Sequence, residues 1–411
     1  MAACPAGVDI RGNHYLIQQG NLDEAARNYL AVQPFPPITG RVCFHPCESA
    51  CARARVDSAV NINAVEHVLG DWAAQMPLEK PVRRHISKVA VVGSGPAGLS
   101  CAWFLALMGY PVTVFEARPF PGGMLRYGIP AYRLPDDVVA TQVRRLEEIG
   151  VRFCCNTRVG KGADVSLAEL KRRGYKAIML APGTSASRRL ELEGSDLPGV
   201  HWGLDFLSAC RSDEKPVISG DVVVVGGGDV AVDAAITARR LGAARVHMAC
   251  LESREEMPAY PHNQKDAEDE GIEFHCGFGP ARLLQEDGRL VGLELHACTS
   301  LKGERGRKRP QVPEDRLPGQ GIGQEPRHER GRVPADPQDP MAENVRPLDM
   351  EACFAEALRC MTCGSRSRIA YNDDCMTCFT CELRCPSGAI FVHPFKERFA
   401  RTLDQVDVVK S

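Results

Sequence analysis

Residues 88–116, KVAVVGSGPAGLSCAWFLALMGYPVTVFE, form the stretch that decides the fold. A short apolar run leads into the glycine-rich residues 93–98. An apolar segment of helical length follows, and a second apolar run ends at an acidic residue. This order predicts the strand, tight turn, helix and strand of a dinucleotide-binding unit rather than a purely structural glycine turn. The residues predicted to contact the pyrophosphate and the ribose are Gly93, Gly95, Pro96, Ala97, Gly98 and Glu116.

Residues 221–252 repeat the same order, with a run of valines, a triple glycine, a helix-length segment, a second apolar run and a closing acid. Two such units in one chain indicate two different dinucleotides, and hydride transfer between FAD and a nicotinamide is the chemistry that would use both. The predicted fold class is therefore α/β with two Rossmann-like nucleotide-binding domains. The predicted contacts of the second unit are Gly226, Gly228, Asp229, Ala231, Glu252 and Arg254.

The closing acid of the second unit bears on the choice of nicotinamide. Glu252 stands where a carboxylate would bind the ribose 2′-hydroxyl, an arrangement that favours NADH and repels the 2′-phosphate of NADPH. Arg254 is the neighbouring residue that could assist a phosphate. The sequence therefore favours NADH slightly over NADPH, and the predicted hydride donor is written as NAD(P)H.

Bulk composition excludes several other classes of protein. The 411 residues are 44% hydrophobic and 25% charged, with a formal net charge of −2. These values are ordinary for a soluble globular protein of several domains and indicate neither a nucleic-acid partner nor an anionic membrane surface. No apolar run approaches the roughly 20 residues that span a bilayer, and the first residues lack the pattern of a signal peptide. A cytoplasmic location is the expectation.

Eighteen cysteines are unusual for such a chain, and most of them are grouped. In the first group, Cys43, Cys47 and Cys51 follow one another at steps of four, which indicates zinc or an iron–sulfur cluster. In the second, residues 375–386 read C-x2-C-x2-C-x3-C-P, the run of bacterial [4Fe-4S] ferredoxins, and iron–sulfur is favoured over zinc. The predicted ligands there are Cys360, Cys363, Cys375, Cys378, Cys381 and Cys385. Even with Cys353 these are seven cysteines, one fewer than two clusters with four cysteine ligands each would need.

Residues 4–10 (CPAGVDI), 34–51 (PFPPITGRVCFHPCESAC) and 60–72 (VNINAVEHVLGDW) resemble the N-terminal iron–sulfur domain of the glutamate synthase small subunit, which dihydropyrimidine dehydrogenase shares. The resemblance implies that Cys4, Cys43, Cys47 and Glu66 hold one [4Fe-4S] cluster and that Cys51 is the last ligand of another. The other ligands of that second cluster precede the Cys-Pro pair in this family. The resemblance therefore implies one complete cluster here, unless the natural start lies upstream or another chain supplies ligands.

The resemblance extends to residues 122–135 (GGMLRYGIPAYRLP), which in this family lie along FAD, and it implies contacts from Gly123, Met124 and Arg133. It breaks at residues 301–347, which are rich in Arg, Pro and Gly and poor in large apolar residues. Residues 321–326 look like a remnant of the family's return to the flavin domain, while the later glycine–aspartate motif is missing. This segment is expected to be a linker or a degenerate remnant of the FAD domain, which leaves the second half of that domain incomplete.

The expected organisation is a helical iron–sulfur domain at residues 1–80, an FAD domain at 85–205, an NAD(P) domain at 206–300, the linker at 301–347 and a ferredoxin-like domain at 348–411. The resemblance implies an iron–sulfur flavoprotein oxidoreductase that moves electrons from NAD(P)H through FAD and [4Fe-4S] clusters to a partner protein or large catalytic subunit. No catalytic acid or base is needed for this task. The alternatives are a stand-alone diaphorase or ferredoxin reductase, and a non-catalytic iron–sulfur scaffold that has lost its flavin.

Overall fold

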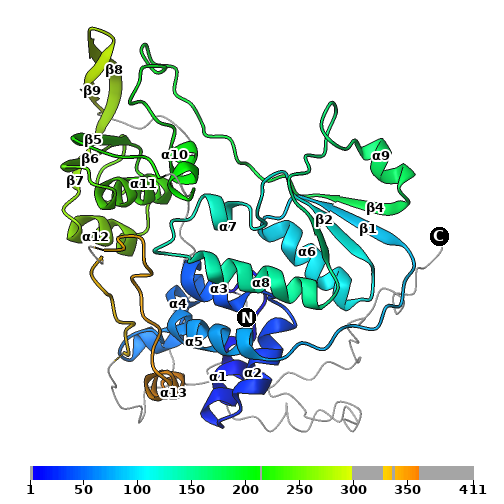
Figure 1. Ribbon diagram of the computed structural model, residues 1–411. Helices are drawn as coiled ribbons and strands as arrows, with labels where there is room; N and C mark the ends of the chain where they lie inside the picture. The colour runs from blue at the N-terminus through cyan, green and yellow to red at the C-terminus, as the bar shows by residue number, and fades with distance from the viewer. Residues whose placement is uncertain (1–2, 213–214, 299–326, 336–337, 361–411) are drawn as a thin grey trace, which may run out of the picture.

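The computed structural model describes residues 3–212, 215–298, 327–335 and 338–360 of the chain. Figure 1 shows a helical region at the bottom, one parallel sheet with its helices at the right and a second at the left. The three regions follow one another along the chain. The described helix nearest the C-terminus, however, returns to the helical region at the start of the chain.

The helical region is built from short helices, and a polar side chain closes the first turn of three of them. Asp9 accepts a hydrogen bond from the backbone N–H of Gly12 at 3.1 Å, and Asn61 accepts one from that of Ala64 at 3.3 Å. Such N-caps satisfy backbone donors that the helix itself leaves free. The elements are α1 (Ile10–Gln18), α2 (Leu22–Leu30), α3 (Pro36–Val42), α4 (Pro46–Ser49), the 3-10 turn η1 (Ala52–Arg55) and α5 (Ile62–Gln75).

Helix α13 (Met350–Leu358) packs against this N-terminal region. Cys353 and Ala357 are fully buried in the same apolar cluster as Val8, Ile17 and Leu69. The predicted domain boundary at residue 348 therefore separates α13 from the helices that it contacts. Because the apolar face of α13 matches α1 and α5 only in three dimensions, this placement could not be read from the order of the chain.

The first parallel sheet has the strand order β3-β2-β1-β4. Val89–Val92 of β1 pair with Val112–Phe115 of β2, so the strands predicted on both sides of the first glycine turn are confirmed. A helix at Asp136–Glu148 and strands at Arg152–Cys154 and Tyr175–Leu180 complete this region. The elements are β1 (Lys88–Val92), α6 (Pro96–Leu107), β2 (Val112–Phe115), α7 (Met124–Tyr127), α8 (Asp136–Glu148), β3 (Arg152–Cys154), α9 (Leu167–Arg172) and β4 (Tyr175–Leu180).

Strand β4 is an edge of this sheet in the part of the chain that the structure describes. Its Met179 and Leu180 are 40% and 56% exposed. Strands of parallel sheets are usually covered on both faces and read as continuous apolar runs. The apolar sequence of β4 is thus that of an inner strand, while its surroundings are those of an edge.

The second parallel sheet has the order β5-β6-β7, and one core packs helices α10 to α12 against it. A two-stranded antiparallel ribbon projects beyond this sheet at the upper left of Figure 1. The strand, helix and strand predicted around the second glycine turn are confirmed. The elements are α10 (Gly203–Cys210), β5 (Asp221–Val225), α11 (Asp229–Arg240), β6 (Arg245–Cys250), α12 (Pro261–Asp269), β7 (Glu273–Cys276), β8 (Phe278–Glu286) and β9 (Arg289–Ala297).

The described residues 327–335 and 338–347 form a loop with one isolated bridge between Arg332 and Val345. The loop contacts the helical region through polar groups and buries Met341 in the core of the second sheet. Arg327 pairs with Glu48 at 2.9 Å, and Arg330 donates to the carbonyl of Gly40 at 2.9 Å. These contacts hold a segment that has few apolar side chains to bury. No described helix is long and apolar enough to cross a membrane.

Arg359, whose side chain is 1% exposed, anchors the C-terminal end of α13. Its guanidinium contacts Glu356 at 2.7 Å and Asp57 at 3.2 Å, and Glu356 is fully buried. Replacing Arg359 with Ala removes the cation beside a buried carboxylate, which costs roughly 3–5 kcal/mol. We expect the free energy of unfolding to fall by an amount of this order, measured by urea titration of the full chain with circular dichroism.

The matched control is Arg27→Ala. Arg27 also pairs with carboxylates of its own helix, but its side chain is 60% exposed. We expect a change within about 0.5 kcal/mol there. Equal effects of the two substitutions would contradict the anchoring role of Arg359.

Candidate functional site

The first glycine turn lies between β1 and α6, and its backbone is tightly packed. Gly93 has φ +99°, which favours glycine, and a side chain there would overlap the carbonyl of Ala181. A side chain at Gly98 would overlap the carbonyl of Gly93. At Gly95, by contrast, an added Cβ would meet no described atom within 4 Å. The open side of the turn is therefore the N-terminus of the twelve-residue α6, where Pro96 and Ala97 begin the helix.

Ser94 and Glu116 join this turn to the second predicted flavin segment. Glu116 is buried and accepts hydrogen bonds from the backbone N–H of Ser94 at 3.0 Å and from the Ser94 hydroxyl. The hydroxyl of Ser94 also lies 3.0 Å from the backbone nitrogen of Gly122. An added Cβ at Gly123 would lie 2.6 Å from the Cα of Gly95, so the two segments are in contact. The open face, the helix terminus and the acid fit a pyrophosphate and a ribose, since a carboxylate can accept further hydrogen bonds.

Two other predicted flavin residues lie in different surroundings. Met124 begins α7, and its sulfur faces Gly128 within the same segment. Arg133 turns away to the second unit, where it pairs with Asp233 and donates to the side chain of Asn263 at 2.7 Å. Arg133 thus links the two glycine-turn units, a role that the sequence did not suggest.

The second glycine turn has the same construction. An added Cβ at Gly228 would meet no described atom within 4 Å, and this residue is the N-cap of the twelve-residue α11. Gly226 has φ +138°, and an added Cβ there would meet the Ala231 side chain at an ordinary 3.4 Å. Asp229 accepts hydrogen bonds from the Tyr260 backbone at 3.0 Å and the Asn263 side chain at 2.7 Å. These bonds fix the loop before α12 over the first turn of α11.

The acid and the arginine predicted at the nicotinamide ribose lie at the end of β6. A carboxylate oxygen of Glu252 lies 3.0 Å from where a Cβ of Gly227 would be, so Glu252 borders the glycine turn. Arg254 is held by an ion pair with Glu268 and stacks on the ring of Phe274 at 3.9 Å. The carboxylate of Glu252 is therefore beside the glycine turn, whereas the guanidinium of Arg254 contacts Glu268 and Phe274.

The structure brings together the four residues assigned to the first cluster. Burial and the negative charges of Glu48, Cys43, Glu66 and Cys4 together raise the pKa of the Cys47 thiol to about 12. Burial also raises the pKa of Cys43, whose sulfur lies 3.3 Å from the backbone nitrogen of His45. Thiolates and a carboxylate that repel one another can all be charged when metal ions lie among them. The donor set therefore fits an iron–sulfur cluster.

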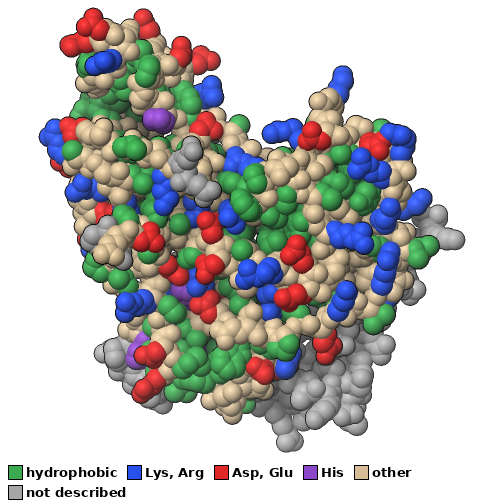
Figure 2. Space-filling model, viewed as in Figure 1, with side chains coloured by type: hydrophobic (Ala, Val, Ile, Leu, Met, Phe, Trp, Pro, Cys, Tyr) green, Lys and Arg blue, Asp and Glu red, His purple; other side chains and the backbone are tan. Residues whose placement is uncertain are grey.

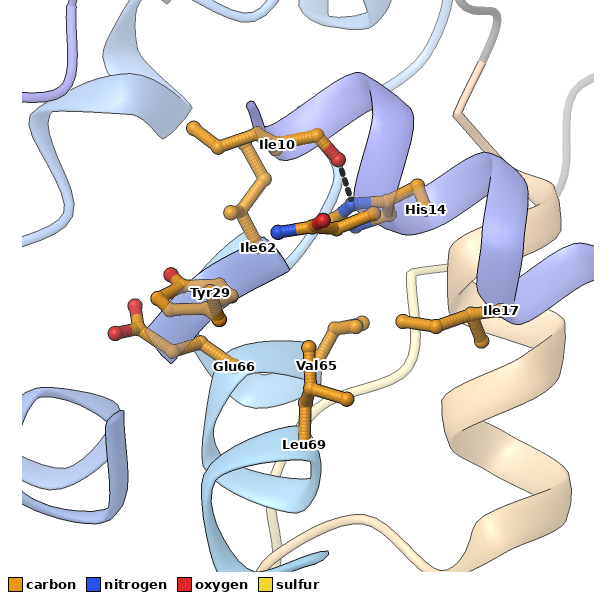
Figure 3. A pocket seen from close by; sticks show the side chains of 9 residues that line it. Ile10, His14, Ile17, Tyr29, Ile62, Val65, Glu66 and Leu69 are labelled. Atoms are coloured by element: carbon orange, nitrogen blue, oxygen red, sulfur yellow. Dashed lines mark hydrogen bonds between the residues drawn. The ribbon is translucent and has the colours of Figure 1, made fainter. Parts of the chain in front are cut away.

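Glu66 projects from α5 toward Tyr29 of α2, as Figure 3 shows. Burial raises its pKa to about 7, and hydrogen bonds from Thr39, Tyr29 and Asn63 oppose that shift. Beside the pair is a cavity of about 10 Å³, also lined by Asn13 and His14, which is about the size of one water molecule. A carboxylate in this setting keeps its negative charge most easily beside a cation.

The other predicted ligands are more scattered. Cys51 begins η1 and is half-buried. Cys360 follows α13, and its carbonyl lies 3.5 Å from the side-chain nitrogen of Gln18. The remaining predicted ligands of the C-terminal run lie outside the described residues: Cys363, Cys375, Cys378, Cys381 and Cys385.

A cavity of about 350 Å³ lies where the three regions meet. The helical region contributes Cys43 to its wall, the segment after the first glycine turn contributes Ile129 and Arg133, and the second glycine turn contributes Asp229. His67 also lines it; burial, together with the charges of Arg41 and Arg330, lowers the pKa of this histidine to about 2. The cavity therefore adjoins Cys43, a predicted cluster ligand, and both predicted nucleotide sites.

Aromatic contacts missed by the sequence reasoning close one side of this junction. The rings of Phe44 and Tyr260 stack at 4.1 Å with an angle of 8° between them, and those of His45 and His262 lie 5.7 Å apart. Each pair joins the cysteine segment to the start of α12. The aromatic residues next to Cys43 in the sequence could have suggested these ring contacts. Their partners, Tyr260 and His262, are far away in the sequence and could not be predicted.

Comparison with known proteins identifies the family. The family described as "Pyridine nucleotide-disulphide oxidoreductase" matches residues 87–308. The chain belongs to this family. A second family, described as "Dihydroprymidine dehydrogenase domain II, 4Fe-4S cluster", matches residues 1–78. This oxidoreductase therefore combines a family whose cofactors are FAD and NAD(P)H with an N-terminal [4Fe-4S] domain, as the sequence predicted.

Its curated relatives include subunits of larger oxidoreductases. The chain is 37% identical to the beta subunit of an NADP(+)-dependent formate dehydrogenase from Moorella thermoacetica, over 75% of this chain and 47% of that protein. It is 37% identical to the beta subunit of an NADPH-Fe(3+) oxidoreductase from Geobacter sulfurreducens, over 76% and 47%. It is 35% identical to the NADPH glutamate synthase small chain of Halomonas elongata, over 75% and 68%. The chain spans about half the length of the first two.

The cluster assignment predicts the outcome of replacing Cys47 with Ala. One cluster ligand is then lost, and we expect bound iron to fall by about four atoms per chain. Iron analysis and visible absorption of anaerobically purified protein measure the loss. Cys101→Ala is the control, because Cys101 is a half-buried thiol packed beside the core of the first sheet. Unchanged iron content in Cys47→Ala would exclude Cys47 as a ligand.

Proposed function

We propose that this chain is an iron–sulfur flavoprotein that transfers electrons from NAD(P)H through FAD and [4Fe-4S] clusters to a partner protein. The observation that carries the proposal is the shared cavity, which places Cys43 beside residues of both glycine-turn units. When bound, FAD supplies the conversion of a two-electron hydride donor into single electrons. The chain's own residues bind and orient the carriers around this junction.

The proposed division of the chain follows the sequence. Residues 1–80 would form the cluster domain, with α13 added to it. Residues 85–205 and 206–300 would be two Rossmann-like domains for FAD and NAD(P)H. Residues 301–347 would link them to a ferredoxin-like domain in 348–411. The parallel order of both sheets and the open N-termini of α6 and α11 support the two nucleotide domains.

The proposed electron acceptor is a partner protein or a larger catalytic subunit, working in the cytoplasm. The formate dehydrogenase and Fe(3+) oxidoreductase relatives are named as subunits, which supports this view. No described residue is assigned as a catalytic acid or base, because hydride transfer between two bound cofactors needs positioning and exclusion of water.

Two glycine substitutions test the function at separate sites. Gly95→Val would fill the open face at the start of α6, and Gly228→Val would do the same at α11. Both backbones are extended with negative φ and have free space, so both variants should fold. We expect wild type to purify with flavin and to reduce a dye with NAD(P)H. Gly95→Val should lose flavin, whereas Gly228→Val should keep it and lose reduction by NAD(P)H.

Absorption spectra and steady-state dye reduction under nitrogen measure these outcomes, and chemical reduction of Gly228→Val by dithionite confirms that its flavin is intact. A wild-type chain with clusters and without flavin would overturn the proposal in favour of an iron–sulfur scaffold. Rapid dye reduction that persists after Cys47→Ala would instead indicate a diaphorase in which this cluster is not on the path.

The position of Glu252 predicts a preference for NADH, although the relatives compared above are named for NADP(+) or NADPH. A like-charge contact with the 2′-phosphate costs several kcal/mol when it is poorly screened, and 1.4 kcal/mol is a factor of ten. We expect Glu252→Gln to shift the ratio of kcat/KM for NADH over NADPH by about tenfold toward NADPH. Glu255→Gln, an exposed neighbour, is the control. A ratio that is unchanged in Glu252→Gln would contradict the role of Glu252.

A further inference from the structure

We propose that His247, Glu273 and His275 form a binding site for a divalent transition metal such as Zn²⁺. The three residues lie on neighbouring strands of the second sheet, apart from the glycine turn and from the predicted cluster cysteines. One ligand atom from each residue lies within 4.8 Å of the others. Two imidazoles and one carboxylate are a common donor set for zinc in proteins.

The strand register explains how the site arises. His247 of β6 pairs directly with Glu273 of β7, and His275 follows two residues later on β7. Because side chains alternate along a strand, Glu273 and His275 point to the same face, the one that carries His247. The opposite face carries Met248 and belongs to the apolar core. The metal-ligating groups therefore converge on the face away from that core.

The distances match those of a coordinated ion. Nδ1 of His247 lies 3.1 Å from Nε2 of His275 and 3.4 Å from a carboxylate oxygen of Glu273. Tetrahedral zinc with ligand bonds of about 2.0–2.1 Å holds neighbouring ligand atoms about 3.3 Å apart. The two imidazole rings are tilted by 43° rather than stacked, so their nitrogens can face one point.

The surroundings suit a cation that enters from solvent. Glu273 is exposed, and the two histidines are partly buried. The nearby Arg245 is paired with Asp221, so its positive charge is balanced. Three protein ligands leave the fourth position of a tetrahedral ion open to water. Bound metal would connect β7, the edge strand of the described sheet, to β6.

The test is zinc binding by the full chain with its iron–sulfur sites loaded, measured by mass spectrometry of metals after dialysis against ZnCl₂. We expect wild type to retain about one more zinc ion per chain than His247→Gln or His275→Gln. Glu273→Gln should weaken zinc binding at least about tenfold, the lower end of what loss of a supporting residue costs. His296→Gln, which changes an exposed histidine of β9, should bind like wild type.

A second measurement guards against misfolded variants. Zinc should raise the melting temperature of wild type and His296→Gln, since a ligand of the folded state stabilises it, and should leave that of Glu273→Gln unchanged at the same concentration. Glu273 is an exposed side chain, so its substitution should leave the fold intact. Equal zinc content in all these proteins, or no zinc-dependent stabilisation of wild type, would overturn the proposal and leave a hydrogen-bonded trio.

Discussion

The junction of the three regions depends on pairing of charges that are removed from water. Arg41 is bound by Asp71 at 2.6 Å and by Glu343 at 2.8 Å, and its side chain is nearly buried. Arg133 pairs with Asp233 across the two nucleotide units, and Arg327 pairs with Glu48 across the loop and the helical region. A buried charge without its partner is strongly destabilising. Each pair thus joins segments far apart in the chain and holds the walls of the cavity in place.

The two glycine turns share one backbone geometry. In each, a glycine with positive φ follows the strand, and a second glycine leaves the helix N-terminus open. The turns differ in what lies beside them. Glu116 is buried and accepts hydrogen bonds from Ser94 of the first turn. Glu252 borders the second turn through a contact of its carboxylate with Gly227. The same backbone geometry is therefore combined with different surroundings of the acid that is predicted to bind a ribose.

The edge strand β4 has an apolar sequence that does not match its exposed surroundings. An apolar strand with exposed Met179 and Leu180 is unusual at the edge of a parallel sheet. The described part of the loop lies on the helical region, held by Arg327 and Arg330, and on the second sheet, where Met341 is buried. The departure of residues 301–347 from the family pattern stays a prediction from the sequence.

Sequence alone determined the features whose causes are local. The glycine turns and the strands around them follow from side-chain volume, backbone freedom and short-range periodicity. Together with the cysteine spacing they predicted the cofactors, and the resemblance of several motifs to a known family predicted the oxidoreductase. Sequence could not show that α13 joins the N-terminal helices, that Arg133 contacts the second unit, or that Phe44 stacks on Tyr260. It also could not bring His247 and His275 together. Those contacts depend on strand register and on the packing of distant segments, which only the tertiary structure decides.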